Sequence, residues 1–431
     1  MASYPEEVPK SATPSFEDEE EFANLIAALE ILQLQEIALQ TQKQLESALD
    51  SDITCAVDSP PLCGSFNLVY KVLFSDGIAW VIRIPAREQD TQPSAVRRLE
   101  GDILTQRFIQ EKAPSIPIPR IHAWSLDTAN IIRRPYVIAD FVRGTTLFSV
   151  WNDKNWISSE KRQKIFNQLA EWMTELAAIE LPRIGRLELT SGLKDQYTIV
   201  PFEPHTKIDD VGSPLGPYDS GYAFLSDLLK KRRENSDDPM FALLQFFLSV
   251  LIDHTIDGPP FTLRHPDFDS QNILVAEDGT ITGLIDWDGV SAYPRQGGAA
   301  AYPSWLTVDW DPLYHGWHPS YSEEQNAKHD SPEELHLYRE MYLAAIDSAS
   351  QGKLTHITRN SHLWHALIIA ATGTYATAHI ARHLSKFVLG SGILGHEIEH
   401  SIKSATWFKM GPSLNSIAYL KGLFIRRTSV P

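Results

Sequence analysis

The sequence contains little cysteine, a deficit of positive charge and no long apolar run. Its two cysteines, Cys55 and Cys63, lie in a chain of 431 residues, too few for a disulfide framework, so we expect reduced thiols in a reducing compartment. No apolar run reaches the roughly 18 residues of a membrane span, so we expect no membrane partner. Lysine and arginine number 38 against 55 aspartates and glutamates, a net charge of −17, which argues against nucleic acid as a partner.

What the sequence does contain is typical of a globular protein. Hydrophobic residues make up 43% and charged residues 22%, and the length predicts two lobes or more. The acidic balance suits a protein that meets metal ions or amines, or one that is simply well solvated. Residues 1–19 are acidic and contain Pro and Ser, so they are expected to form a mobile tail, and they do not resemble an arginine-rich transit peptide. We therefore expect a cytoplasmic protein without an obligate protein partner.

The first third of the chain combines helical and strand patterns. Apolar residues recur every three or four positions from Glu20 to about Leu49, which predicts a helix. The period then changes to two in "FNLVYKVLF" and "IAWVIRIP", which flank the turn signal "SDG" and predict a β-hairpin. Further elements are expected as a helix over 94–111, an extended segment over 116–124 and a strand over 135–142.

After Gly144 the pattern becomes mostly helical. Helices are expected over 158–180, where Ser158 caps the start and Pro182 stops the end, and over 222–231 and 239–256. Two strands over 273–276 and 280–286 flank the turn "EDG". The fold class is therefore α+β. The expected organisation is a tail over 1–19, a helical extension over 20–60, an N-lobe over 61–144 and a C-lobe over 145–431.

The segment "LRHPDFDSQNILVAEDGTITGLIDWDGV", residues 263–290, concentrates polar groups beside apolar strands. Asp267 precedes Asn272 by five residues, and Asp286 follows Asn272 by fourteen. Phosphoryl transfer from ATP needs a carboxylate that receives the proton of the acceptor hydroxyl, and oxygen ligands that hold Mg²⁺. A loop with Asp and Asn, followed by a hairpin that ends in Asp, provides these groups. The segment therefore indicates a kinase-type site that uses ATP and Mg²⁺.

This segment resembles the aminoglycoside phosphotransferase and choline kinase-like families, which carry an H-G-D-x-x-x-x-N loop and an I-D-W/F-[DE] segment. The nearest likeness is to the fungal branch called the phosphotransferase enzyme family, where H-P-D is familiar, as in "HPDFDSQN" here. The resemblance spans roughly residues 64–317. It implies a protein kinase-like bilobal fold, with a small strand-rich N-lobe, a larger helical C-lobe and ATP bound between them.

The resemblance also implies a role for each matching residue. Asp267 would be the catalytic base, His265 would brace its loop, and Asn272 and Asp286 would bind Mg²⁺. Residues implied to bind the nucleotide are Gly64, Ser65 and Phe66 in the covering loop, Arg83 in place of the usual lysine, Glu100 as its helix partner, and Asp140 and Val142 in the hinge. Two departures concern the N-lobe, since arginine replaces lysine at Arg83 and the covering loop has one glycine rather than three.

Several residues have alternative interpretations. Arg83 and Glu100 can form a purely structural pair, and Gly64 can serve a simple bend. Asp269 can face the acceptor or cap a helix-like turn, and Asp288 can be a metal-side acid or an acceptor contact. An aromatic cluster with Trp305 and Asp309 can hold a cationic acceptor, although packing of a loop against the core is the more common use of such residues.

We therefore expect an ATP-dependent phosphotransferase that acts on a hydroxyl of a small molecule, and an amine-bearing acceptor is one alternative. A catalytically weak nucleotide-binding protein or scaffold is the second hypothesis, because of Arg83 and the single glycine. Protein kinase activity is a third, although no "APE"-like segment follows Asp286. The motif "HEIEH", residues 396–400, matches a zinc-protease pattern, but it needs a third ligand, and a polar helix face is the simpler interpretation.

Overall fold

The computed structural model describes residues 16–45, 53–64, 66–189, 196–202, 214–234, 240–311, 314–372 and 376–389. The chain divides into two compact units. One comprises residues 1–144 together with 282–288, and the other comprises 145–281 and 289–431. The short segment 282–288 carries Asp286 and Asp288, and it belongs to the first unit although it was expected in the C-lobe. The motif "HEIEH" lies outside the described residues.

The first unit is built on an antiparallel sheet. Its strands are β1 (Cys55–Val57), β2 (Leu62–Cys63), β3 (Asn67–Phe74), β4 (Ala79–Pro85), β5 (Ile121–Ser125) and β6 (Tyr136–Asp140). Their order is β1-β3-β4-β6-β5, and β2 pairs with β3 at the side. The predicted hairpin is confirmed, because β3 and β4 pair from Asn67↔Pro85 to Leu73↔Ala79. Because successive side chains of a strand point to opposite faces of the sheet, the alternating residues of this hairpin face its two sides in turn.

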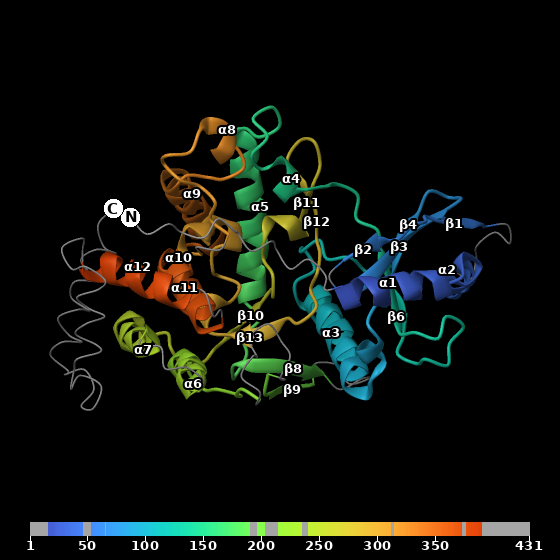
Figure 1. The fold of residues 1–431 in the computed structure, drawn as a ribbon, viewed down its shortest axis with the longest axis horizontal. Coiled ribbons are helices and arrows are strands. Elements are labelled where there is room, and N and C mark those ends of the chain that lie inside the picture. The colour runs from blue at the N-terminus through green and yellow to red at the C-terminus, as the bar shows by residue number, and fades with distance from the viewer. Residues whose placement is uncertain are drawn as a thin grey trace. The chain divides into compact units, whose positions relative to one another are not determined.

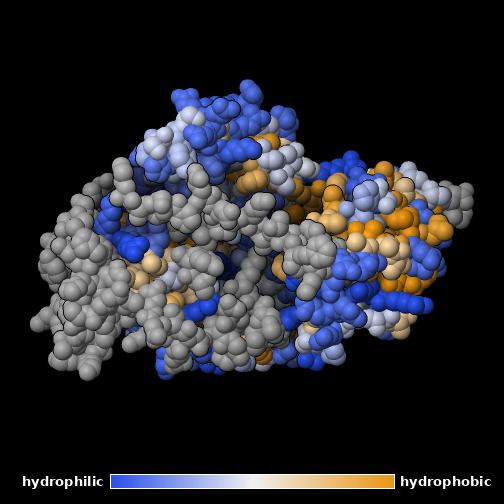
Figure 2. Space-filling view, in the orientation of Figure 1, coloured by the Kyte–Doolittle hydropathy of each residue, from blue (hydrophilic) through white to orange (hydrophobic). Residues whose placement is uncertain are grey.

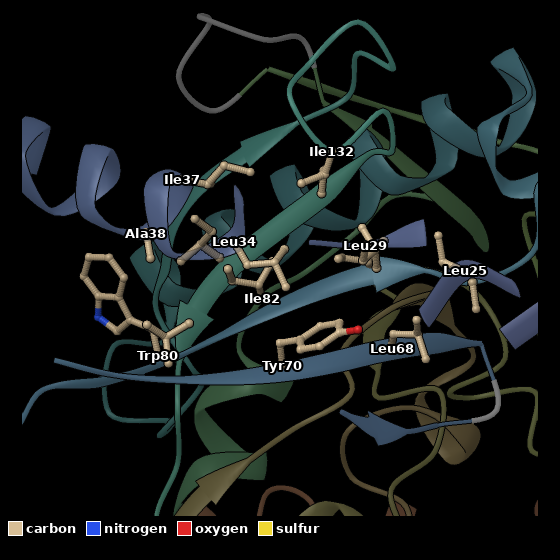
Figure 3. Close-up of a cluster of buried hydrophobic side chains, with 14 of the residues drawn as sticks. Leu25, Leu29, Leu34, Ile37, Ala38, Leu68, Tyr70, Trp80, Ile82 and Ile132 are labelled. Atoms are coloured by element: carbon tan, nitrogen blue, oxygen red, sulfur yellow. The ribbon is translucent and has the colours of Figure 1, made fainter. Parts of the chain in front are cut away.

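Helices cover the sheet of the first unit on both faces. They are α1 (Phe16–Ala28), α2 (Ile31–Leu45) and α3 (Pro93–Lys112), with a 3-10 turn over Glu88–Thr91. Figure 3 shows Leu25 of α1, Leu29 between the two helices, and Leu34 and Ile37 of α2 against the strands that carry Ile82, in one buried cluster. Ile103 of α3 packs against side chains of β5 and β6 in a separate cluster. Segment 20–60 therefore shares its core with the strands that follow it.

The helical pattern predicted from Glu20 is confirmed over the described residues, but it forms two helices, because the chain bends by 70° between α1 and α2. A straight helix of thirty residues would be about 45 Å long, whereas the eight residues of β3 extend over about 27 Å. The bend lets both halves place apolar side chains on one sheet. No single described helix has the length and apolar character of a membrane span, and α1 with α2 reaches that level only as a bent pair.

The second unit is mainly helical (Figure 1). Its helices are α4 (Leu147–Val150), α5 (Ser159–Ala177), α6 (Gly221–Glu234), α7 (Met240–Leu251), α8 (Glu323–Asn326), α9 (Pro332–Ser350), α10 (Thr355–Arg359), α11 (Ser361–Thr372) and α12 (Thr377–Leu389). Ser158 caps α5 as predicted, since its side chain accepts from the Lys161 N–H. Helices α5 and α9 pack together, α6 packs on α7 and α11 packs on α12.

The second unit also contains strands that the sequence patterns did not predict. A four-stranded antiparallel sheet has the order β10-β13-β8-β9, formed by β8 (Gly185–Leu189), β9 (Tyr197–Val200), β10 (Thr262–Arg264) and β13 (Ser291–Tyr293). Strand β11 (Ile273–Val275) confirms the strand predicted over 273–276, and it pairs with β7 (Thr145–Thr146). Three 3-10 turns cover Ser270–Asn272, Arg295–Gly297 and Ser304–Trp310. Strand β12 (Ile281–Leu284) begins at the boundary between the two units.

Two contacts hold segment 282–288 in the first unit. A Cβ on Gly283 would lie 2.5 Å from Val142 Cγ1, so any side chain at this position would clash. The backbone N–H of Leu284 donates to the Pro117 carbonyl at 3.0 Å. Both contacts attach segment 282–288 to the first unit.

Figure 2 shows apolar surface over the first unit, whose exposed large apolar side chains include Leu62, Phe66 and Leu73.

Candidate functional site

The predicted catalytic loop lies between β10 and β11 of the second unit. His265 is 4% exposed, and its Nδ1 accepts the backbone N–H of Asp267 at 3.2 Å. The backbone carbonyl of Asp267 accepts the N–H of Asp269 at 2.8 Å, and the loop then enters a 3-10 turn. The ring of His265 is thus buried and hydrogen-bonded to the loop backbone, which suits a residue that braces the loop.

The carboxylate of Asp267 is oriented by two amide side chains of its own loop. Gln271 Nε2 donates to Asp267 Oδ2 at 2.8 Å, and Asn272 Nδ2 donates to the same oxygen at 3.1 Å. Asn272 Nδ2 also donates to the Asp267 carbonyl at 2.8 Å. Neutral donors fix the carboxylate without neutralising it, and within the described residues Oδ1 is left for an incoming hydroxyl. This arrangement suits a general base.

Asn272 and Asp286 provide the hard oxygen atoms that Mg²⁺ prefers. Asn272 is 9% exposed, and since its nitrogen faces Asp267, its amide oxygen is the atom that can face a metal. Asp286 is exposed and has φ +64°, a left-handed conformation that Asp tolerates better than most residues. Among the described residues no group of three or more His, Cys, Asp or Glu side chains could hold a metal. Each of these oxygen atoms is of the kind that suits Mg²⁺, which keeps waters and takes further ligands from substrate phosphates.

Arg83 forms an ion pair with Asp288 inside the first unit. Its Nη2 bonds Asp288 Oδ2, and Nη1 donates to Oδ1 at 3.4 Å. The negative charge of Asp288 is the main cause that raises the pKa of Arg83, burial opposes it, and the charges of Asp286 and Asp102 add to it. Because β4 alternates, Arg83 lies on the same face of the sheet as Val81, which packs with the α3 cluster.

The predicted pairing of Arg83 with Glu100 is therefore wrong, since the ion pair is made by Asp288. On α3 the acid whose charge acts on Arg83 is Asp102. The physical reason is the helical period, since two residues at about 100° each place Glu100 and Asp102 on nearly opposite sides of α3. No sequence pattern links Arg83 to Asp288, because 205 positions separate them.

The predicted nucleotide-covering loop is a tight connection between β2 and β3. The N–H of Gly64 donates to the Asn67 carbonyl at 3.0 Å, and Cys63 pairs with Leu68. Phe66 is 51% exposed and contacts the guanidinium of Arg87, 5.1 Å from its ring centroid. Ser65 lies outside the described residues. A Cβ on Gly64 would meet only an ordinary contact at 3.5 Å, so the space around Gly64 does not require a glycine.

The predicted hinge begins at the end of β6. The carboxylate of Asp140 accepts from His122 Nε2 at 2.7 Å and from the Arg120 N–H at 3.1 Å. Burial opposes ionisation of Asp140, but these hydrogen bonds outweigh it, so the pKa of Asp140 lies below its ordinary value. The Asp140 N–H donates to the Arg120 carbonyl, and Val142 packs beside Gly283. Asp140 is thus held by side-chain bonds within the first unit.

The residues considered for an acceptor contact have structural partners. Asp309 pairs with Arg339, with 2.7 Å between Oδ1 and Nη1. Asp269 accepts from the hydroxyls of Ser304 and Ser270. Trp305 is 6% exposed and packs against other rings. The cluster therefore packs a loop against the core, which is the more common use recognised in the sequence, and Asp309 is not available to an amine.

A cavity of about 110 Å³ lies beside Asp267 and is lined entirely by the second unit. Its wall includes Arg264, His265, Asp267 and Phe268, and His365 from α11. Arg264 was missed by the sequence analysis. Its position directly before His265 in "LRHPD" was the available signal. A larger cavity of about 510 Å³ in the first unit is lined by residues of α1, α2 and the loop around Arg133, and none of the predicted site residues is among them.

Comparison with known proteins agrees with these motifs. A family model described as "Phosphotransferase enzyme family" matches residues 63–296, more than half of the chain. The chain is 21% identical over 370 residues to "Altered inheritance of mitochondria protein 9, mitochondrial" of Kluyveromyces lactis, covering 70% of this chain and 55% of that protein. The protein of the same name from Clavispora lusitaniae is also 21% identical, with 70% and 56% covered. The chain thus spans about half the length of the curated relatives it matches.

Solved structures with similarity to the chain include two kinases. A putative fructosamine-3-kinase from Thermobifida fusca has 12% identity and a TM-score of 0.44, with 76% of this chain and 92% of that chain covered. An ethanolamine kinase from Plasmodium vivax has 15% identity and a TM-score of 0.41, with 92% and 87% covered.

These comparisons correct one expectation and identify the family. The expected cytoplasmic location is contradicted, because the fungal relatives are named as mitochondrial proteins. The α+β class is confirmed by the strand-rich first unit and the helical second unit. With a match over more than half of its length, the chain belongs to the phosphotransferase enzyme family.

Proposed function

We propose that the protein is an ATP-dependent phosphotransferase that acts on a hydroxyl group of a small molecule. The observation that carries the proposal is Asp267, whose carboxylate is fixed by Gln271 and Asn272 inside the family's loop motif. In this proposal Asp267 receives the proton of the acceptor hydroxyl. The hydroxyl oxygen then bonds to the γ-phosphorus, the bond from that phosphorus to the bridging oxygen breaks, and ADP leaves.

Asn272 and Asp286 are proposed to hold Mg²⁺, which supplies positive charge to the phosphates when it is bound. Arg83 is proposed to bind a phosphate through its planar fork, which matches phosphate oxygens. Asp288 makes that fork part of an internal ion pair, so phosphate binding by Arg83 requires an exchange of partners. These roles separate a base in the second unit from charged groups in the first.

The experiment compares two substitutions. Asp267→Asn keeps the shape but removes the base, so phosphoryl transfer should fall by about 10²–10⁴-fold, while Mg²⁺–ATP binding persists. Asp286→Asn should weaken Mg²⁺-dependent ATP binding as well as turnover, because a charged ligand is lost. Nucleotide affinity by calorimetry at fixed Mg²⁺, and again in excess EDTA, is measured beside ATP turnover with a panel of hydroxylated acceptors.

The matched control is Asp269→Asn, two residues away in the same loop, where the carboxylate accepts from two serines. It should retain turnover. Full turnover in Asp267→Asn would refute the role of Asp267 and make Asp269 the next residue to test. ATP binding that is equally strong in EDTA would refute the metal ligands.

A nucleotide-binding protein without turnover is the second candidate function. It is favoured by the ion pair that engages Arg83 and by the single glycine of the loop before β3. In that case ATP binds with Mg²⁺, no acceptor is phosphorylated, and Asp267→Asn changes neither property. The panel assay described above separates the two candidates.

We also propose that the protein acts in mitochondria. The support is the printed name of the fungal relatives, which are about twice the length that the chain matches. Fractionation of cells that express the full-length protein with a C-terminal tag should place it with a mitochondrial matrix or membrane marker. Exclusive recovery outside mitochondria would refute this proposal.

A further inference from the structure

Arg264, at the entrance of the proposed catalytic loop, is a cation without an ion-pair partner among the described residues. It ends β10, pairs with Ser291 in the sheet, and directly precedes His265. Its guanidinium carbon lies 4.8 Å from the ring centroid of Tyr293, so the stem is held in place. Arg83 and Arg339 form ion pairs with aspartates, whereas no carboxylate in the described part of the chain pairs with Arg264.

Arg264 and Asp267 are the charged side chains of one small cavity. Its other lining groups, within the residues that the structure describes, are apolar, hydroxyl-bearing or imidazole. His365 contributes no second cation, because burial lowers its pKa to about 3 and its Nδ1 bonds the Thr307 hydroxyl at 2.8 Å. The cavity thus presents one positive group and the proposed base.

The size of the cavity limits what can enter it. About 110 Å³ is a few times the roughly 30 Å³ share of one water molecule, and it is well below the ~300–1,000 Å³ of pockets that enclose a drug-sized ligand. The cavity is open to solvent, so it encloses a group of a few heavy atoms, and the rest of a larger ligand would lie outside it. A partly buried arginine without a counter-ion is unfavourable, and an anionic group of a ligand would relieve that cost.

We infer that the acceptor is a small hydroxylated anion, whose carboxylate or phosphate group binds Arg264 while its hydroxyl meets Asp267. This inference rests on the proposed function and names its substrate class. It replaces the amine-bearing alternative, since Asp309 and Asp269 have partners of their own. Because the net charge of −17 repels anions, an anionic acceptor needs a local cation to attract it, and Arg264 is proposed to be that cation.

The test uses four three-carbon probes that share a hydroxylated frame. They are glycerate, glycerol 3-phosphate, glycerol and 3-aminopropane-1,2-diol. Calorimetry on the full chain should show glycerate or glycerol 3-phosphate binding at least about tenfold more tightly than glycerol, with the amine weakest. The two anionic probes distinguish a carboxylate from a phosphate as the group recognised. Arg264→Gln should erase the preference, and Arg264→Lys should keep part of it, because charge remains and the fork is lost.

Arg382→Ala is the matched control, since it removes the same charge from an exposed position on α12. It should leave the preference unchanged, and thermal unfolding of every variant checks that the fold persists. Should Arg264→Gln fail to fold, Arg264→Lys decides by the predicted partial loss. The inference is overturned if glycerol or the amine binds as tightly as the anions, if none of the four binds, or if Arg264→Gln keeps the preference.

Phosphoryl transfer from Mg²⁺–ATP to the same probes is measured separately. Anion binding that depends on Arg264 without any transfer would refute the proposed function and leave the anion site intact. Transfer to glycerol or the amine without anion preference would support the function and refute the substrate class.

Discussion

Two arginine–aspartate pairs, one from each unit, differ in exposure. In the second unit, the Arg339 and Asp309 side chains are 10% and 11% exposed, and Arg339 also donates to the Leu306 carbonyl at 2.7 Å. In the first unit, Arg83 and Asp288 are 23% and 33% exposed. A mostly buried pair with an additional backbone bond holds structure together, whereas a partly exposed pair can exchange a partner for a ligand. The same chemistry thus serves structure in the second unit, and in the first it leaves Arg83 open to the exchange of partners that the proposed phosphate binding would require.

The units also differ in their partly buried histidines, which gives the largest expected effect. Burial lowers the pKa of His362 and His365 to about 3 and that of His383 to about 4, all in the second unit. The unfolded chain binds these protons near pH 6.5, whereas the folded chain does not. Stability is therefore present above pH 6.5 and is lost toward pH 4, by up to about 1.4 kcal/mol per pH unit for each histidine.

The second unit should accordingly lose protection first on acidification. Hydrogen exchange at pH 7, 5.5 and 4.5 should show α11 opening before β3 and β4. His122 is the one histidine in the sequence of the first unit. The pKa of Asp140 is lowered, so the stability that its ionised carboxylate contributes is lost only in more acidic solution. His365→Gln should make the pH dependence shallower, whereas His318→Gln, at an exposed site, should not. Earlier opening of β3 and β4 would contradict this difference between the units.

The two arginine pairs should differ in the cost of breaking them. Arg339→Ala leaves Asp309 buried and uncompensated, so it should lower the free energy of unfolding by about 3–5 kcal/mol. Arg83→Ala should lower it by about 1–2 kcal/mol, because water reaches Asp288, and it should weaken ATP binding. Urea unfolding of both variants measures the costs. Equal costs with unchanged ATP affinity would mean that Arg83 is purely structural.

The smallest expected effect sharpens the role of Asp288. Asp288→Asn should release Arg83 to a phosphate and tighten ATP binding by about two- to fivefold, as expected for a modest, partly exposed ion pair. Glu100→Gln is the control and should change nothing, because Glu100 does not pair with Arg83. Weaker ATP binding in Asp288→Asn would instead favour Asp288 as a metal-side acid, one of the two roles that the sequence left open.

The sequence predicted those elements that depend on interactions between residues close together in the chain. The alternation in β3 and β4, the Ser158 cap of α5 and the spacing of Asp267 and Asn272 are all local, so sequence was enough to place them. The short strands β8, β10 and β13 owe their existence to pairing with distant partners, and their three to five residues carry no reliable sequence signal. The Arg83–Asp288 pair and the arginine cavity likewise depend on the tertiary fold, which residue spacing alone does not encode.

The contact between Gly283 and Val142 has a consequence in genetic terms. A Cβ at position 283 would enter the space of Val142 Cγ1, at 2.5 Å, so Gly283→Ala should behave as a loss-of-function allele although it lies outside the proposed chemistry. Val142→Ala removes the obstructing methyl groups and should act as a second-site suppressor of that allele. Positions 283 and 142 would then be expected to change together in evolution.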